Sequence, residues 1–258
     1  NIMRVCILGS GLTALTLAKA LVNQKISVDI VSSSKNNKID KSRTIGISKS
    51  NYDFFNKNII NIEKIIWKIK KIEIYSDNSI NEKILNFENN DDQLFSIVKN
   101  FYLYEILYKS LLNNKYYKII KPLKKKIKFN EYNIIINTDY LNDFTKKFFN
   151  KKIIKTYNSL AYTTIIGHEK ITNDVAVQIF TRKGPLAFLP ISKNNTSIVY
   201  SIHNSKENNE PNIKDLINKY NFKYKIKKIK KIENFELNSI ILRSYYHENI
   251  LAFGDLLH

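Results

Sequence analysis

The sequence is poor in cysteine, proline, glycine and arginine, and these shortages narrow the class of protein. Cys6 is the only cysteine, so the chain forms no internal disulfide and suits a reducing compartment. No apolar run is long enough to cross a bilayer. The short apolar stretch near the start leads directly into a glycine turn, so we interpret it as a first strand rather than a signal peptide.

The shortage of arginine argues against a nucleic-acid partner. The formal net charge of +19 over 258 residues would otherwise favour one. Nearly all the basic residues are lysines, and the only arginines are Arg4, Arg43, Arg182 and Arg243. Because arginine supplies the bidentate and stacking contacts to bases, we predict no nucleic-acid binding. We interpret the lysines as solvated faces that could also attract an anionic membrane surface.

Motifs for metal binding and nucleophilic catalysis are missing as well. The histidines show no ligand spacing, and no serine or cysteine nucleophile motif occurs. We therefore predict no metal site and assign no catalytic residue. Glycine is so scarce that each glycine indicates a constraint on the backbone. The 6 glycines are Gly9, Gly11, Gly46, Gly167, Gly184 and Gly254.

The opening segment predicts a β-α-β unit that binds a dinucleotide. Residues 4–8 and 27–31 are apolar and strand-like, and residues 12–24 carry apolar side chains at helical spacing. The turn between them fits the pattern G-x-G-x-x-G/A, in which the glycines permit a tight turn and a close approach of phosphate to the helix N-terminus. The turn consists of Gly9, Ser10, Gly11, Leu12, Thr13 and Ala14.

The second strand lacks the acid that usually accepts hydrogen bonds from the adenosine ribose. Ser32 stands at that position, and Asp29 lies within the strand. A missing acid can indicate NADP, but no basic residue follows before Lys35. We expect weaker adenosine binding or a shifted contact.

The rest of the chain predicts a mixed region followed by an antiparallel sheet. Residues 94–114 have the spacing of a helix, and "GPLAFLPI" and "TSIVYSIHN" predict a hairpin across "SKNN". The other expected elements are a turn and helix at 44–58, strands at 64–76, a loop at 77–93, short strands at 121–140, strands at 157–166 and 174–180, and a helix at 212–220.

Three further stretches give the sequence a family resemblance. They are "KSRTIGISKSNYDFF", "AVQIFTRKGPLAFLPIS" and "ILAFGDLLH". With the opening turn they resemble the FAD-dependent aromatic hydroxylases of ubiquinone biosynthesis, a branch of the para-hydroxybenzoate hydroxylase-like flavoprotein monooxygenases. The middle stretch is the most specific, because it matches the family segment Q-x-F-x-x-x-G-P-L-A-x-L-P. The resemblance covers most of the chain, and it implies a chain truncated on its C-terminal side.

The resemblance implies an α/β fold, in which a Rossmann-like FAD-binding domain is interrupted by a mostly antiparallel β-sheet substrate domain. The FAD-binding domain would then be built from three separate parts of the sequence. The implied segments are 1–62 for the first part of the FAD-binding domain, 63–93 for strands of the substrate domain, 94–150 for the second part of the FAD-binding domain, 151–235 for the antiparallel substrate domain, and 236–258 for an incomplete return to the FAD-binding domain.

The resemblance also implies which residues bind FAD. The opening turn would hold the pyrophosphate, Arg43 would lie near the phosphates on the flavin side, and Asp255 would contact the ribityl or pyrophosphate region. Asp139 remains from the family's Ala-Asp-Gly motif, whose glycine is here Tyr140. The implied cofactor-binding residues are Gly9, Ser10, Gly11, Leu12, Thr13, Ala14, Ser32, Arg43, Lys99, Asp139 and Asp255, with His258 matching the histidine of the family's G-D-A-A-H turn. The implied substrate pocket consists of Phe180, Gly184, Pro185, Leu186, Phe188 and Pro190.

The activity implied is the hydroxylation of a prenylated phenol with FAD, NAD(P)H and O₂ in ubiquinone biosynthesis. The implied location is cytoplasmic and peripheral on the cytoplasmic face of the inner membrane, beside other ubiquinone-biosynthesis enzymes. Two alternatives stay open. One is another FAD-dependent oxidoreductase of the same fold, such as a prenyl reductase. The other is a decayed, non-catalytic homologue, suggested by Ser32, Tyr140 and the bulky pair Leu256 and Leu257.

Overall fold

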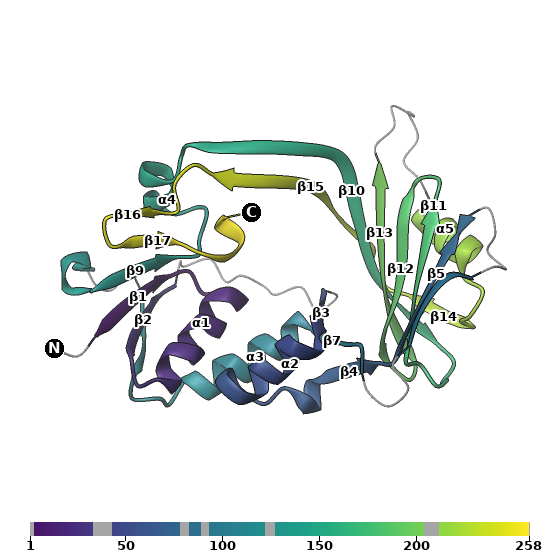
Figure 1. Ribbon diagram of the computed structural model, residues 1–258, viewed down its shortest axis with the longest axis horizontal. Coiled ribbons are helices and arrows are strands. Elements are labelled where there is room, and N and C mark those ends of the chain that lie inside the picture. Colours follow the sequence, from purple (N-terminus) through teal and green to yellow (C-terminus); the bar gives the residue numbers. More distant parts are fainter. Residues whose placement is uncertain are drawn as a thin grey trace.

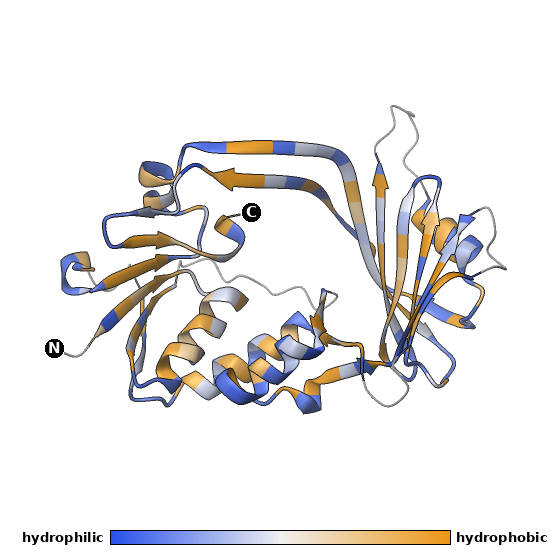
Figure 2. Ribbon diagram, viewed as in Figure 1, coloured by the Kyte–Doolittle hydropathy of each residue, from blue (hydrophilic) through white to orange (hydrophobic). Residues whose placement is uncertain are grey.

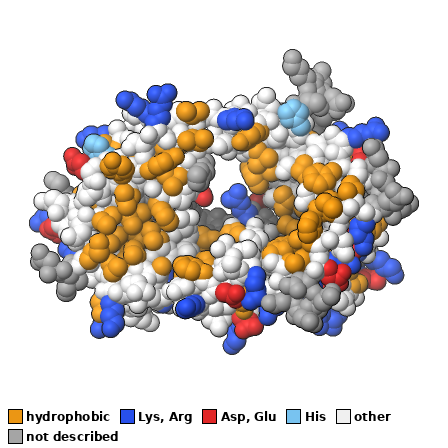
Figure 3. Space-filling model, in the orientation of Figure 1, with side chains coloured by type: hydrophobic (Ala, Val, Ile, Leu, Met, Phe, Trp, Pro, Cys, Tyr) orange, Lys and Arg blue, Asp and Glu red, His pale blue; other side chains and the backbone are white. Residues whose placement is uncertain are grey.

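The computed structural model describes residues 3–32, 43–77, 83–88, 93–121, 127–203 and 212–257. Within these ranges the strands form a six-stranded, an eight-stranded and a three-stranded sheet. Figure 1 shows the six-stranded sheet and the eight-stranded sheet at opposite ends of the molecule, joined by a long ribbon of two strands above and by helices and short strands below. Figure 3 shows a hollow between the two ends, with lysine or arginine atoms inside it.

The six-stranded sheet carries the predicted β-α-β unit. Strand β1 pairs in parallel with β2 and β9, and helices α1 and α3 pack together over one face of the sheet. Figure 2 shows apolar residues concentrated along these strands, where the core lies. The elements are β1 (Arg4–Leu8), α1 (Leu12–Asn23), β2 (Ser27–Val31), α3 (Asn100–Leu111), β8 (Tyr117–Ile120), the 3-10 turn η5 (Phe129–Glu131), β9 (Ile134–Asn137), α4 (Asp143–Phe148), β16 (Tyr246–His247), β17 (Ile250–Ala252) and the 3-10 turn η6 (Gly254–Leu256).

The eight-stranded sheet is antiparallel except where β11 pairs in parallel with β5. Helix α5 covers one face, and Leu186, Phe188 and Tyr200 are buried beneath it. The predicted hairpin is confirmed as β12 and β13. The elements are β5 (Lys71–Ser76), β6 (Lys83–Glu88), β10 (Lys152–His168), β11 (Val175–Thr181), β12 (Gly184–Ser192), β13 (Asn195–His203), α5 (Ile213–Tyr220), β14 (Ile226–Ile229) and β15 (Glu233–Leu242).

A three-stranded sheet connects the two larger ones. Its strands are β3 (Thr44–Ser48), β4 (Ile66–Ile69) and β7 (Phe95–Lys99), with β7 in the centre. Apolar side chains of β4 and β7 pack against β11 and β12 of the eight-stranded sheet. The helices beside it are α2 (Lys49–Phe54), the π-helical η1 (Phe55–Ile59) and the 3-10 turn η2 (Glu63–Ile65).

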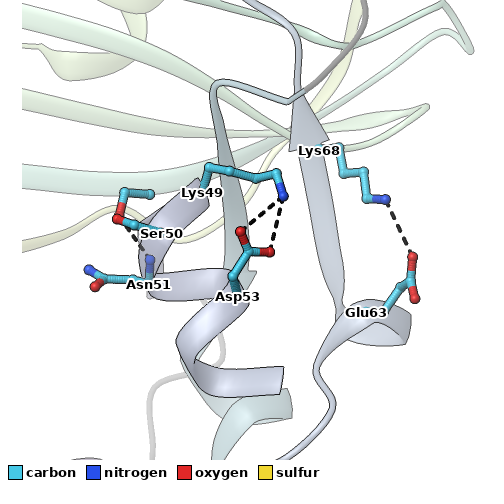
Figure 4. A network of polar contacts seen from close by, with 7 residues as sticks. Lys49, Ser50, Asn51, Asp53, Glu63 and Lys68 are labelled. Carbon is cyan, nitrogen blue, oxygen red and sulfur yellow. Dashed lines mark hydrogen bonds and ion pairs between the residues drawn. The ribbon is translucent and has the colours of Figure 1, made fainter. Parts of the chain in front are cut away.

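Polar contacts fix the helices that flank this small sheet. Ser48 caps α2, because its Oγ accepts a hydrogen bond from the Asn51 amide at 3.3 Å. Figure 4 shows the ion pair of Lys49 with Asp53, at 3.0 Å, one turn further along the same helix. The same view shows Lys68 of β4 reaching back to Glu63 at 3.3 Å.

The structure corrects several of the expected elements. The predicted helix at 94–114 begins only at Asn100, because residues 95–99 form β7, the central strand of a sheet. Ile97 and Val98 are each 1% exposed there, so tertiary pairing overrides the helical spacing. Residues 44–48 form a strand rather than a turn, and the expected loop at 77–93 contains β6. The boundaries of the domains stay predictions.

Candidate cofactor site

The glycine turn after β1 is tight because residues at the ends of β9 and β2 lie directly against it. Gly9 has φ +115°, and a Cβ at this position would clash with the Thr138 hydroxyl, which donates to the Leu8 carbonyl at 2.8 Å. The Gly9 amide donates to the Val31 carbonyl at 3.0 Å. The turn is therefore held between the ends of β9 and β2, and only glycine fits it.

Gly11 has the opposite surroundings. It is the N-cap of α1, with φ −77°, and a Cβ on it would meet no atom within 4 Å. No side chain caps α1, and its first turn contains no acidic residue. The start of the helix therefore combines free space at Gly11 with the absence of a side-chain cap and of an acid in the first turn, and this arrangement suits a phosphate.

The last described turn of the chain packs against the start of α1. Gly254 has φ +70°, and a Cβ there would come within 2.5 Å of the Thr13 Cγ2 atom. The backbone also joins the end of β9, because the Phe253 amide donates to the Asn137 carbonyl at 2.9 Å. The fold thus brings the exposed Asp255 to the same end of α1 as the glycine turn, although the two motifs lie at opposite ends of the sequence.

Asp139 lies directly behind the glycine turn. Its Cβ is 3.5 Å from the position a Gly9 Cβ would take, and its carboxylate accepts from the Leu141 amide at 2.9 Å. Tyr140, which replaces the family's glycine, is 65% exposed. The larger side chain therefore projects outward and leaves the backbone turn intact.

Ser32 and Ser10 meet beside the glycine turn, where the sequence predicts the ribose contact. The Ser32 Oγ donates to the Ser10 Oγ at 3.2 Å, so two hydroxyls meet where an acid is expected. Asp29 cannot replace the acid, because its carboxylate is ion-paired with Arg4 at 3.0 Å and accepts from the Tyr132 hydroxyl at 2.6 Å. The adenosine side of the site therefore offers hydrogen bonds without a charge.

Arg43 and Lys99 come together because β3 and β7 pair. Lys99 lies opposite Thr44, and the Asn100 amide donates to the Arg43 carbonyl at 3.1 Å. Across the described ranges, neither side chain forms an ion pair with a carboxylate. The guanidinium of Arg43 stacks instead on the Phe235 ring, and burial lowers the pKa of Lys99. Two cations without acidic partners favour an anionic ligand.

An apolar cavity of about 610 Å³ adjoins the glycine turn and β3. Among the described residues, no charged side chain lines it, and the polar lining residues are Thr13, Thr16 and Asn51. The apolar lining comes from α1, β3, α2, η1, α3 and Phe253. The N-terminus of helix α1 is therefore suited to an anion, and one side of the helix borders an apolar cavity.

The predicted pocket residues of the eight-stranded sheet divide between its two faces. Side chains alternate along a strand, so Phe180 and Pro185, which pair with each other, lie on the face opposite to α5. Leu186 and Phe188 are 0% and 2% exposed in the core beneath α5, and Pro190 shares their face. The structure therefore divides the predicted pocket residues between the two faces of the sheet, and their role in substrate binding stays a prediction.

The packing of neighbouring strands explains why residue 184 is a glycine. Its φ is +139°, and a Cβ there would clash with the Ser201 carbonyl oxygen of the neighbouring strand. Sequence reasoning missed Phe235 and Ser197, which reach Arg43 and Thr44 from the eight-stranded sheet, because nothing local distinguishes them from core residues. His258 lies outside the described residues.

None of the helices in the described residues is long and apolar enough to span a membrane. Nor do these residues contain a group of three histidine, cysteine or acidic side chains that could hold a metal ion.

Comparison with known proteins identifies the fold. The sequence matches no protein-family model and no curated protein. Among solved structures, p-nitrophenol 4-monooxygenase PnpA from Pseudomonas putida is similar over this entire chain and 73% of its own, with a TM-score of 0.77 and 10% identity. PqsL from Pseudomonas aeruginosa, a probable FAD-dependent monooxygenase, is similar over 79% of its own chain, with a TM-score of 0.77 and 12% identity.

A third similar structure is 2-methyl-3-hydroxypyridine-5-carboxylic acid oxygenase, with a TM-score of 0.74 and 11% identity over 76% of its chain. The chain therefore has the fold of the para-hydroxybenzoate hydroxylase-like flavoprotein monooxygenases, and the predicted fold class is confirmed. At this level of identity the likeness establishes the fold, and the activity has to be argued from the site.

Proposed function

We propose that this protein is an FAD-dependent monooxygenase that hydroxylates an aromatic substrate. The observation that carries the proposal is the open space at Gly11, at the uncapped end of α1. Arg43 and Lys99, two cations without an ion-paired carboxylate among the described residues, support it. A dinucleotide brings a dianionic pyrophosphate, which complements both features. The fold, shared with monooxygenases, supports FAD as that dinucleotide.

The chemistry of the residues present suits each part of FAD. The amides after Gly11 would bind the pyrophosphate, and Arg43 and Lys99 would balance its charge. Ser32 would hydrogen-bond the adenosine ribose, and Asp255 would contact the ribityl or pyrophosphate region. When bound, FAD would accept electrons from NAD(P)H and use O₂ to add one oxygen atom to the ring, the other leaving as water. The chain's own part is to orient both molecules and exclude bulk water.

The substitution Gly11→Val tests the cofactor site with little risk to folding. The backbone at Gly11 suits any residue, and the new side chain would fill the space that the pyrophosphate needs. We expect the wild-type protein to keep a flavin absorption spectrum after incubation with FAD and desalting, and the variant to emerge colourless. The melting temperature of the two proteins should be nearly equal.

Gly167→Val is the matched control for this experiment. Gly167 lies in β10, and a Cβ there would meet its nearest neighbours at an ordinary 3.9 Å. This variant should retain FAD. A wild-type protein that binds no FAD would refute the proposal and favour a non-catalytic homologue, whereas loss of FAD from both variants would show that Gly11 has no special role.

The finer proposal concerns the substrate. We infer a prenylated phenol of ubiquinone biosynthesis, with NAD(P)H as reductant, from the resemblance of residues 176–192 to that branch of the family. NAD(P)H oxidation should rise with a prenylated phenol, and mass spectrometry should find one added oxygen atom on the ring. A saturated prenyl chain with no added oxygen would instead identify a prenyl reductase.

A prenylated substrate would reside in a membrane, so we also propose peripheral association with an anionic surface through the lysines. The protein should sediment with vesicles containing phosphatidylserine at low salt and be released at high salt. Failure to sediment at low salt would refute this association and leave the proposed chemistry untouched.

A further inference from the structure

Arg43 directly precedes β3, in the three-stranded sheet that connects the six-stranded and eight-stranded sheets. Its carbonyl accepts from the Asn100 amide at 3.1 Å, which ties it to the start of α3. The next residue, Thr44, has its Oγ1 3.1 Å from the Oγ of Ser197, which is buried in β13. The backbone at Arg43 is therefore fixed from both sides.

Among the described residues, the side chain of Arg43 contacts an aromatic ring and forms no ion pair with an acid. Its guanidinium carbon lies 5.1 Å from the centroid of the Phe235 ring. Arg4 shows the contrast, because it is ion-paired with Asp29 and Glu131. A guanidinium that stacks on a ring through its face keeps the N–H groups along its edge available as donors.

Phe235 reaches Arg43 from far along the sequence. It lies in β15, opposite Ala161 of β10, in the pair of strands that joins the two ends of the molecule (Figure 1). The ring is half-buried, and the pairing of β15 with β10 fixes the backbone that carries it. A long arginine side chain loses about 2 kcal/mol of rotamer entropy when it is fixed. Contact with the ring restricts the side chain before any ligand arrives, and this pre-organisation favours binding.

We propose that Phe235 is a positioning residue that holds the guanidinium of Arg43 ready for the anionic part of the cofactor. This inference rests on the proposed function, because the anion is taken to be the pyrophosphate of FAD. It adds a residue from the eight-stranded sheet to the FAD site, and it couples the placement of β15 to the affinity for the cofactor.

The test is a double-mutant cycle on FAD binding, measured by the quenching of flavin fluorescence. Phe235→Leu should weaken FAD binding about two- to fivefold, the range expected for a cation over an exposed ring. In an Arg43→Gln background the same change should have no further effect, because the partner is gone. Phe235→Tyr should bind FAD with wild-type affinity, since tyrosine keeps the aromatic ring.

Phe87→Leu is the control, because Phe87 is a similar aromatic residue, 49% exposed, on β6 at the opposite edge of the eight-stranded sheet. It should leave FAD affinity unchanged. Equal losses from Phe235→Leu in the presence and absence of Arg43, or no loss while the wild-type protein binds FAD, would overturn the positioning role alone. A wild-type protein that binds no FAD would overturn both this inference and the proposed function.

Discussion

Gly11 and Gly184 each lie at one end of a regular element, yet their surroundings are opposite. Gly11, at the six-stranded sheet, has φ −77° and no atom within 4 Å of the place where a side chain would begin. Gly184, in the eight-stranded sheet, has φ +139° and the Ser201 carbonyl where its Cβ would lie. Gly11 leaves space that a ligand could occupy, and Gly184 lets two strands approach each other.

The polar groups of the two regions differ in the same way. In the eight-stranded sheet, the buried His168 is 2.9 Å from the Thr196 hydroxyl, and Asn173 accepts from Tyr224 at 3.1 Å, so these groups satisfy one another. At the three-stranded sheet, Arg43 and Lys99 have aromatic rings beside them and no ion-paired carboxylate among the residues that the structure describes. Unfilled space and uncompensated charge are what the proposed cofactor site requires, whereas filled space is typical of the scaffold.

The largest effect should come from Gly184→Ala. A side chain there meets a backbone carbonyl and requires a positive φ, so we expect the free energy of unfolding to fall by about 3 kcal/mol. Urea denaturation followed by circular dichroism would measure it. Gly11→Ala, the matched change at the open site, should alter stability by less than about 1 kcal/mol. Similar losses for both would remove the contrast between the two regions.

A smaller effect is expected from Lys99→Gln. Removing one of two cations should weaken FAD binding about tenfold, the size of one charge-assisted hydrogen bond. Lys109→Gln serves as the control, because Lys109 is exposed on α3 and ion-paired with Glu105 at 2.8 Å. Isothermal titration with FAD would measure both variants, and an equal loss in the control would show a general effect of charge.

The same lysine predicts a dependence on pH. Burial lowers the pKa of Lys99 in the free protein, and a bound phosphate would favour the charged form and raise that pKa again. Binding of FAD should therefore weaken as the pH rises through the lowered pKa, because a proton must then be taken up. The Lys99→Gln variant should lack this dependence in the same alkaline titration, and a persistent dependence would assign it to another group.

The smallest effect is expected at Glu73 in the scaffold. Burial opposes its ionisation, but hydrogen bonds from Lys83 at 2.8 Å and from the Tyr75 hydroxyl at 2.9 Å outweigh this and lower the pKa of Glu73. The stabilisation is therefore present above the ordinary pKa of glutamate and is lost as the pH falls through the lowered value. Glu73→Gln should cost less than about 1 kcal/mol at neutral pH.

This cost should disappear in acid, which denaturation at a series of pH values would show. Glu88→Gln is the matched control, because Glu88 is more exposed and pairs only with Lys71, at 3.5 Å, among the described residues. A cost of Glu73→Gln that grows as the pH falls would contradict the assignment.

Much of the cofactor region could be predicted from the sequence. The strand at 4–8, the helix from Leu12 and the strand at 27–31 follow from local periodicity, and the glycine turn follows from spacing alone. The strand β7 could not be predicted, because Phe95–Lys99 continues into a helix and becomes a strand only between β3 and β4. The division of the pocket residues between two faces likewise depends on pairing, which places Leu186 and Phe188 under α5.

Local sequence pattern accounts for the local chemistry: a glycine turn that opens a helix, rare glycines at constrained points, and a serine in place of the ribose acid. Which of these residues meet depends on the three-dimensional fold. It set Gly254 against Thr13, Arg43 beside Lys99, and Phe235 against Arg43. The physical reason is that short-range pattern governs turns and helices, whereas strand order and packing between sheets join residues far apart in the chain.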